Sequence, residues 1–452
     1  MSERPRLVVC LFAAFIGLAG LFGLPPLDRD EARFAQASAQ MLESGDFVTI
    51  RFLDEERNKK PAGIHWLQSA TVSTFSSAEA RQIWAYRLPS FMAMVGAAFF
   101  IFQIGKTLFN QQTGLIASVI FASAPIAAAE ATIAKTDAML LLTICIAQWA
   151  LAKSIAANQT SLGRALIFWL ALAASILIKG PIGLLVCGST LVVLCIADKT
   201  IKPLQMMRPL LGMLIVIAIV SPWAMAINAA TDGRFFADAL GGDLLGKVGS
   251  AQERHAGPPG YHLLLLPILF WPAAIFLPTA LQTAFQERRE MPWRFLLAWA
   301  APAWLLFELT STKLPHYTLP LYPSIAIAVA AILTGTLRGE KKAQQTRLNL
   351  VGVILYGLIS LCLVIAIPWL SAYYNGSMSL ALSAALITAA GTAYVVYLFL
   401  KKRILPAAFS AIACSSIFAW LMMQAVLPSL EDFRVSPSLV EAVKASLSLI
   451  HI

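Results

Sequence analysis

The densest charge in this chain is the segment Asp28-Arg29-Asp30-Glu31-Ala32-Arg33, which holds five charges in six residues. It directly follows Leu7 to Leu27, the first stretch that is hydrophobic over a membrane-spanning length. Charge beside a bilayer is costly to place, so such a cluster indicates a functional site. Its carboxylates could hold sugar hydroxyls, bind a cation or take the proton of an acceptor group.

Further charged groups fall at the same predicted depth, each just outside the end of a hydrophobic segment. They are Lys59-Lys60-Pro61, Lys135-Thr136-Asp137, Lys179-Gly180-Pro181, Glu253-Arg254-His255 and Lys313-Leu314-Pro315-His316-Tyr317. Lysine binds a lipid phosphate as a point charge, and arginine binds it as a fork. Because all these groups are predicted on one side of the membrane, we expect them to meet in a single cavity.

Each group also has a simpler interpretation. Asp30 can be only a helix cap, and Asp137 can close a short loop by pairing with Lys135. The others fit ordinary positions at a membrane interface, as helix ends, hydrogen-bonded histidines or aromatic-belt residues: Lys179, His255, His316 and Tyr317. Glu308, one turn before an external helix end, can pair with Lys313. Function is favoured because the groups share one side.

The elements that must position these residues are transmembrane helices. The chain has 452 residues, of which 58% are hydrophobic and 13% charged, and its mean hydropathy is +0.73. These values predict an all-α polytopic membrane protein. About thirteen segments are long enough to span: 7–27, 88–105, 114–130, 138–152, 165–178, 181–197, 209–228, 263–283, 295–310, 316–334, 348–370, 378–400 and 404–428.

Charge predicts the orientation of these spans. When the connections alternate between the two sides, lysine and arginine strongly outnumber acidic residues on one side, which is cytoplasmic by the positive-inside rule. The net charge of +10 is therefore an orientation signal and implies no nucleic-acid partner. This topology leaves the N-terminus in the cytoplasm. A retained first helix is favoured over a cleaved signal, because Pro25-Pro26-Leu27 ends the run without a small-residue cleavage site.

One transmembrane domain, residues 1–428, is expected, with two long external connections and a short external tail, 429–452. The first connection, 28–87, contains two predicted interfacial helices. One has Phe34, Ala37, Ser38, Met41 and Leu42 at helical spacing, with Gly45 as its stop; the other begins at Pro61 and runs to Val72. The second connection is 229–262. All six cysteines fall within predicted spans, so neither a disulfide framework nor a metal-ligand spacing is predicted.

The ordered motifs resemble those of the membrane GT-C glycosyltransferases. Closest are the lipid A aminoarabinose transferases and the bacterial relatives of protein O-mannosyltransferases. The motifs are Asp30-Glu31-Ala32-Arg33-Phe34 with Met41 to Asp46, Lys60-Pro61 with Trp66, Thr136-Asp137-Ala138, Lys179-Gly180-Pro181, Glu253-Arg254-His255 with Gly257-Pro258, and Lys313 to Tyr317 with Leu319-Pro320. Together they run from residue 28 to about residue 323.

The resemblance implies a bundle of about a dozen helices with external juxtamembrane helices, and transfer of a sugar from polyprenyl phosphate, usually undecaprenyl phosphate in bacteria. It implies roles for individual residues as well. The catalytic carboxylates would be Asp30 and Asp137. Residues around the donor phosphate would be Arg33, Lys60, Arg254, Lys313 and Tyr317. Contacts to acceptor or sugar would come from Glu31, His255, His316 and Lys179.

Two departures limit the resemblance. Aminoarabinose transferases typically carry Glu before the Lys-Pro pair, where this chain has Lys59. A divalent cation therefore stays open as a cofactor, with His255 as the only weak metal candidate. The relatives also carry a sizeable external domain after their last helix, whereas 429–452 is short, so acceptor recognition is expected to differ.

The function expected from the sequence is that of an inverting glycosyltransferase of the bacterial inner membrane with a periplasmic active site. It would act in the lipid bilayer on lipid A or another lipopolysaccharide component. One alternative is a protein O-glycosyltransferase that uses the same donor. An alternative of another class is a lipid-linked sugar flippase or transporter, which should show helices broken at mid-membrane and inverted repeats. The charges of this chain lie at one interface, and no repeat is visible in its sequence.

Overall fold

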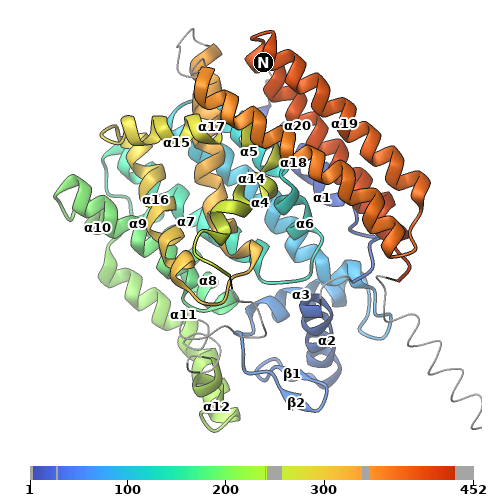
Figure 1. Cartoon of the computed structure of the whole chain (residues 1–452). Coiled ribbons are helices and arrows are strands. Elements are labelled where there is room, and N and C mark those ends of the chain that lie inside the picture. Colours follow the sequence, from blue (N-terminus) through green and yellow to red (C-terminus); the bar gives the residue numbers. More distant parts are fainter. Residues whose placement is uncertain (1–3, 27–28, 240, 242–256, 338–345, 433–452) are drawn as a thin grey trace, which may run out of the picture.

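A computed structural model describes residues 4–26, 29–239, 241, 257–337 and 346–432, and Figure 1 shows an assembly of helices. The helices from the first half of the chain are α1 (Pro5–Leu18), α2 (Arg29–Ser44), α3 (Gly63–Phe75), α4 (Ile83–Leu108), α5 (Gln111–Ala122), α6 (Pro125–Ala131), α7 (Asp137–Ala157), α8 (Leu162–Lys179), α9 (Ile182–Asp198), α10 (Lys202–Met206) and α11 (Pro209–Ala230).

Those from the second half are α12 (Arg234–Phe236), α14 (Tyr261–Leu269), η2 (Trp271–Phe276), α15 (Leu277–Gln286), α16 (Met291–Leu309), η3 (Pro315–Leu321), α17 (Tyr322–Leu337), α18 (Thr346–Tyr373), α19 (Met378–Leu400), α20 (Ile404–Leu421), η5 (Met422–Val426) and α21 (Leu427–Ser429). The two short strands β1 (Arg51–Phe52) and β2 (Glu55–Glu56) pair antiparallel. The all-α polytopic prediction is confirmed, apart from this small ribbon.

Within the described ranges, eight helices are long and apolar enough to cross a membrane, or up to ten if each bent pair is one span. Two more apolar helices, α1 and α9, are shorter. Every predicted span contains a helix, but the count of thirteen spans stays a prediction. Side chains on the outside of the bundle are large and apolar, as a lipid-facing surface requires; examples are Leu210, Leu264 and Leu386.

Two of the predicted spans are bent and not continuous. The span 114–130 is broken between α5 and α6 by 69°, and 263–283 is broken after α14 by 107°. Proline follows each break, as Pro125 at the start of α6 and Pro272 near the start of η2. A proline has no N–H for the helical ladder and clashes with the preceding turn, so it can begin a helix but cannot continue one.

Residues 29–87, the described part of the connection that the sequence predicts to be external, form a unit at one end of the bundle, where Figure 1 draws α2, α3, β1 and β2 together. Both predicted interfacial helices are present, and Gly45 ends α2 with a positive φ of 71°. The unit contacts α11 through a hydrogen bond, in which the indole N–H of Trp223 donates to the carbonyl of Val48 at 3.2 Å. The ring of Trp66 lies edge-on to that of Trp223.

The opposite end of the bundle joins connections that the sequence places together in the cytoplasm. Arg294, at the start of α16, forms a 2.7 Å ion pair with Asp198 at the end of α9. Arg164 donates hydrogen bonds to the carbonyls of Lys153 and Gln159. The first of these contacts brings two of the predicted cytoplasmic connections together, and the alternation of all the connections stays a prediction.

Candidate active site

The carboxylate of Asp30 lies at the exposed start of α2 with two guanidinium groups near it. It is 3.5 Å from Arg33 Nη1 and 3.9 Å from Arg57 Nη2. The Arg57 guanidinium also lies over the ring of Phe34, 5.2 Å from its centroid, which is a cation–π geometry. Asp30 lies within the first turn of α2, one residue after Arg29. We call Asp30, Arg33, Phe34 and Arg57 the Asp30 group.

Glu31, the next residue, points into the protein. Its two carboxylate oxygens accept from Arg87 at 2.7 and 2.9 Å, and the first also accepts from the backbone N–H of Ala134 at 2.9 Å. Glu31 is 1% exposed and Arg87 0%. With its oxygens bound inside the protein, Glu31 is not placed to contact a sugar or acceptor, so the role expected from the sequence needs correction.

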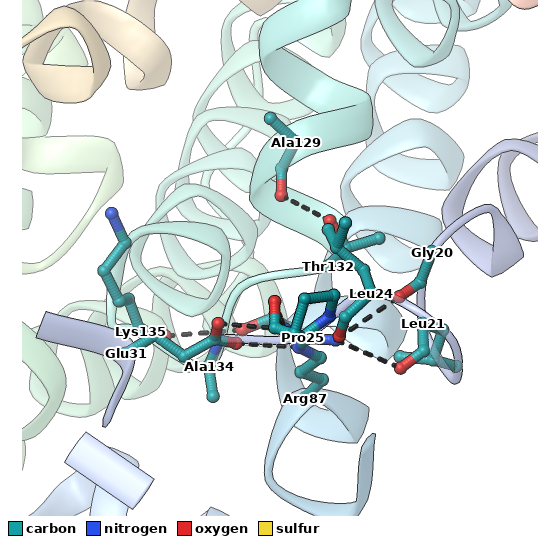
Figure 2. Close-up of polar contacts among 11 residues, drawn as sticks. Gly20, Leu21, Leu24, Pro25, Glu31, Arg87, Ala129, Thr132, Ala134 and Lys135 are labelled. Atoms are coloured by element: carbon teal, nitrogen blue, oxygen red, sulfur yellow. Dashed lines mark hydrogen bonds and ion pairs between the residues drawn. The ribbon is translucent and has the colours of Figure 1, made fainter. Parts of the chain in front are cut away.

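Arg87 uses its whole fork to hold the chain that leads into the Asp30 group, as Figure 2 shows. Beyond Glu31, its N–H groups reach the carbonyls that follow α1, with the shortest bond, 2.6 Å, to Leu24. The other carbonyls are those of Gly20, Leu21 and Pro25. Glu31 and Arg87 therefore connect the end of α1, the start of α2, helix α4 and the turn before α7.

That turn leads to a second cluster around Asp137, the first residue of α7. Asp137 Oδ1 lies 2.5 Å from Lys179 Nζ and 3.8 Å from His316 Nε2. The other ring nitrogen of His316 lies 3.9 Å from Glu130, which in turn lies 3.9 Å from Lys135 Nζ. The Lys179 ammonium also faces the ring of Tyr317 at 5.8 Å. We call these residues the Asp137 group.

The Asp137 group joins segments that are far apart in the sequence. Asp137 and Lys135 come from the α6–α7 turn, Lys179 ends α8, and His316 lies in η3. Three of the groups that the sequence predicted on one face are therefore in contact. Glu31 binds Ala134, the neighbour of Lys135, so the Asp30 group adjoins the same turn.

Lys313, three residues before His316 of the Asp137 group, is buried. Its ammonium donates to the carbonyls of Thr310 at 2.7 Å and Gly257 at 3.1 Å, and the residue is 6% exposed. Gly257 is needed there, since a Cβ at that position would lie 2.8 Å from Lys313 Cδ. The proposed pairing of Lys313 with Glu308 is wrong. Glu308 instead accepts from the backbone N–H groups of Gly260, His262 and Leu263 and caps the start of α14.

The remaining predicted residues are only partly placed. Lys60 is half-buried in the segment between β2 and α3. Asp28, Arg254 and His255 lie outside the described residues, so their expected roles stay predictions. Within the described ranges, no group of three or more His, Cys, Asp or Glu side chains could hold a metal ion. In the Asp137 group the carboxylates of Glu130 and Asp137 lie at ion-pair distance from Lys135 and Lys179.

Sequence reasoning missed Arg57, Arg87 and Glu130. Arg57 follows the short β-ribbon, whose fold has no periodic signal over such a length. From the sequence, Arg87 is placed at the end of the connection 28–87. A charge near the start of a 26-residue apolar helix is nevertheless a recognisable signal of a functional or paired residue. Glu130 lies in the apolar run before the Lys135 motif, where a single acidic residue among alanines likewise indicates a functional or paired residue.

Beneath the Asp30 group, His65 forms a buried polar contact between α2 and α3. Its Nδ1 is 2.8 Å from Ser38 Oγ, which donates to Gln68 Oε1 at 2.6 Å, and its ring stacks on Phe34. Burial, reinforced by the charge of Arg57, lowers the pKa of His65 to about 3. The imidazole is therefore neutral in the folded protein at neutral pH.

This contact predicts acid sensitivity of the external unit. In the unfolded chain histidine has a pKa of about 6.5. Below that pH the unfolded state binds a proton that folded His65 does not, so the free energy of unfolding falls as pH drops toward 3, by up to about 1.4 kcal/mol per pH unit. Thermal melting at pH 7 and pH 5 should show a larger loss for the wild type than for His65→Gln. Equal losses would contradict the assignment.

Comparison with known proteins agrees with this architecture. Residues 59–225 match the model of the dolichyl-phosphate-mannose-protein mannosyltransferase family. An undecaprenyl phosphate-alpha-4-amino-4-deoxy-L-arabinose arabinosyl transferase of Aeromonas hydrophila is 28% identical over 97% of this chain and 80% of its own length. The transferase of the same name from Pectobacterium atrosepticum is 26% identical over 85% of this chain, a match that spans 65% of that relative.

Among solved structures, ArnT from Cupriavidus metallidurans bound to undecaprenyl phosphate superposes with a TM-score of 0.76. The match is 20% identical and covers 94% of this chain and 77% of ArnT. The chain has the GT-C fold of ArnT. The Asp30 group lies on α2 and on the segment after β2, and Glu31 of α2 joins it to the turn that carries the Asp137 group.

Proposed function

We propose that this protein is a glycosyltransferase that moves a sugar from an undecaprenyl-phosphate-linked donor to lipid A or another lipopolysaccharide component. The observation that carries the proposal is the contact of Asp137 with Lys179 and His316 beside the Asp30 group. Acidic and basic groups gathered at one end of an apolar bundle suit a substrate that is half lipid and half phosphate. The names of the relatives and the solved ArnT complex support the donor.

The reaction is a single displacement with inversion. The bond between the anomeric carbon and the phosphate oxygen breaks, and its electron pair leaves with undecaprenyl phosphate. The acceptor oxygen forms the new bond on the opposite face of the sugar. The leaving undecaprenyl phosphate is a phosphate monoester, whose conjugate acid is far stronger than an alcohol (second phosphate pKa about 6), so its departure needs no protonation, and nearby cations stabilise the developing charge. Arg33, Lys60 and Lys313 are proposed for this task.

Asp30 has one of two tasks, depending on the acceptor. A hydroxyl acceptor must lose its proton, and Asp30 would receive it. A lipid A phosphate is already ionised, and Asp30 would then orient Arg33, which lies 3.5 Å away, or the sugar itself. Asp137 is proposed to hold Lys179 and His316 in place at the acceptor side.

The protein is proposed to work in the bacterial inner membrane with its N-terminus in the cytoplasm and the two groups in the periplasm. The distribution of lysine and arginine over the connections supports this orientation. A protein O-glycosyltransferase with the same donor is the second candidate, favoured by the match of residues 59–225 to a protein mannosyltransferase family.

A transporter is disfavoured despite the two broken helix pairs. In transporters such breaks expose backbone groups that bind ions or substrate near the membrane centre. Here the first break is packed by apolar or small residues: Phe121, Ala122 and Ala124 are buried, and Ser415 donates to the carbonyl of Ser123. The charged residues lie at the end of the bundle instead.

Mass spectrometry tests the function directly. Lipid A and envelope glycans from a strain that lacks the gene should lose a sugar, and the purified protein should restore it from an undecaprenyl-phosphate sugar. Loss of a glycan from a protein and not from lipid A would favour the second candidate. An unchanged glycan profile, with no transfer by the purified protein, would reject both enzymes.

Lys313→Ala is expected to weaken binding of undecaprenyl phosphate by about tenfold to a hundredfold, the usual cost of losing a charged hydrogen bond. The matched control is Lys401→Ala, since Lys401 is exposed, is predicted on the cytoplasmic side, and its ammonium lies over the ring of Tyr397. Binding to protein in detergent can be measured by the rise in melting temperature. Equal losses in the two variants would contradict the predicted location of the donor phosphate.

A further inference from the structure

Two arginines lie at ion-pair distance from Asp30, and they are held in different ways. Arg33 comes from the same helix, three residues after Asp30, and its side chain is 27% exposed. Arg57 comes from the segment after β2, and its side chain is 12% exposed. An ion pair within one turn of a helix is weak and constrains both side chains little. Arg57 approaches from outside α2, so it can fix where the carboxylate points.

The segment that carries Arg57 is anchored in the external unit. The backbone N–H of Arg57 donates to the carbonyl of Ile50 at 2.8 Å. The next residue, Asn58, is buried, and its amide donates to the carboxylates of Glu56 and Asp238. The position of Arg57 is therefore fixed by contacts to the residue before β1 and to a residue that follows α12.

The side chain of Arg57 is held as well. Its guanidinium lies over the Phe34 ring, 5.2 Å from the centroid, a geometry in which the ring attracts a cation. Phe34 is 5% exposed and stacks on the ring of His65, with 5.3 Å between the centroids. The imidazole of His65 is neutral because burial lowers its pKa, and its Nδ1 is bonded to Ser38 Oγ at 2.8 Å. The ring that Arg57 contacts is thus supported by buried side chains of α2 and α3.

We propose, on the basis of the function above, that Arg57 is a positioning residue for Asp30. Arg57 directs the carboxylate, 3.9 Å away, toward the sugar, whereas the more exposed Arg33 remains available for the donor phosphate. The side chain of Asp30 is itself 43% exposed at the start of its helix, so without a contact from another segment several rotamers would be open to it. Misplacement of a reacting group by about 1 Å can cost about a hundredfold in rate.

Kinetics of the purified full-length protein distinguish positioning from contact with the donor. The substrates are lipid A and an undecaprenyl phosphate that carries a 4-amino sugar. Arg57→Gln should lower kcat by about tenfold or more and change KM for the donor by less than about twofold, because the contacts of the donor are kept. Arg33→Gln should instead raise KM for the donor.

Rates are expressed per binding site titrated with undecaprenyl phosphate, so a loss of folded protein does not change them. An unchanged kcat in Arg57→Gln would overturn the inference. A rise in KM that accounts for the whole loss of kcat/KM would do the same, because it would make Arg57 a contact of the donor.

A double variant tests whether Arg57 acts through Asp30. In the Asp30→Asn background, the additional change Arg57→Gln should lower the residual rate by less than about threefold, because the group that Arg57 positions is already lost. Losses that multiply would show that Arg57 acts independently of Asp30, which contradicts the inference. Arg81→Gln, which removes an exposed arginine paired with Glu43, should leave kcat unchanged in either background.

Chemical labelling tests the contact without sugar transfer. A water-soluble carbodiimide with an amine modifies accessible carboxylates of the protein in detergent, and peptide mass spectrometry reads the extent at Asp30. Asp30 should be modified about threefold faster in Arg57→Gln than in the wild type, because one guanidinium group at ion-pair distance is lost. Glu43, on the same helix and paired with Arg81, should be modified equally in both proteins if the unit stays folded. Equal rates at Asp30 would overturn the inference.

The labelling rates also separate this inference from the proposed function. If the wild type transfers no sugar and undecaprenyl phosphate does not raise its melting temperature, the function fails. The rate at Asp30 then still decides whether Arg57 holds this carboxylate.

Discussion

Asp30→Asn is expected to lower sugar transfer by about a hundredfold or more while leaving the protein folded. The carboxylate lies at the start of α2, partly exposed, and both Arg33 and Arg57 lie at ion-pair distance from it. Loss of one charged group that acts in the transition state typically costs on the order of 3 kcal/mol, which is about a hundredfold in rate. Asparagine keeps the size of the side chain but can neither take a proton nor hold two guanidinium groups by charge.

The control for this experiment lies on the same helix. Glu43 is an exposed carboxylate near the end of α2 that pairs with Arg81 at 2.6 Å, so Glu43→Gln should keep nearly full activity. Initial rates and thermal melting are measured for both variants. Full activity of Asp30→Asn would remove this carboxylate from the chemistry, and Asp137 would become the leading candidate.

The second large effect concerns stability. Arg87→Ala should destabilise the protein by about 3–5 kcal/mol, because it leaves the charge of Glu31 buried without a partner. It also frees the carbonyls that follow α1, of which Leu24 forms the shortest bond at 2.6 Å. Unfolding in increasing denaturant, followed by tryptophan fluorescence, measures the loss.

Arg81→Ala is the matched control, because Arg81 is 48% exposed and its pair with Glu43 lies at the surface. Exposed pairs contribute roughly 0–1 kcal/mol. A double variant, Glu31→Gln with Arg87→Met, should recover part of the loss, since no uncompensated charge remains inside. Similar effects of Arg87→Ala and Arg81→Ala would show that the buried pair does not hold the external unit.

Much of this fold follows from hydropathy and from helix signals. The apolar spans are visible because a helix in lipid must satisfy its backbone internally and present apolar side chains. Helices α2 and α3 could be predicted from apolar spacing and from Gly45. The bends at Pro125 and Pro272 were missed, since an average over an apolar window is insensitive to a change of direction inside it.

The site was predictable as a set of motifs but not as a set of contacts. The sequence placed Asp137, Lys179 and His316 on one face, and all three meet. It could not separate the neighbours Asp30 and Glu31, because adjacent residues of a helix point in different directions and only packing decides which one faces inward. The pairing of Glu31 with Arg87 could not be predicted, since the two residues are 56 positions apart in the sequence.

The fork of Arg87 also affects the order in which the chain can be assembled. Residues 20–25 and Glu31 leave the ribosome well before their arginine does, so the start of α2 has no fixed position while α1 alone is inserted. Ala134 arrives later still and completes the bonds to Glu31. Assembly of the end of the bundle that carries α2 is therefore expected to wait for α4 and for the turn after α6, and nascent chains shorter than that should be open to protease near residue 30.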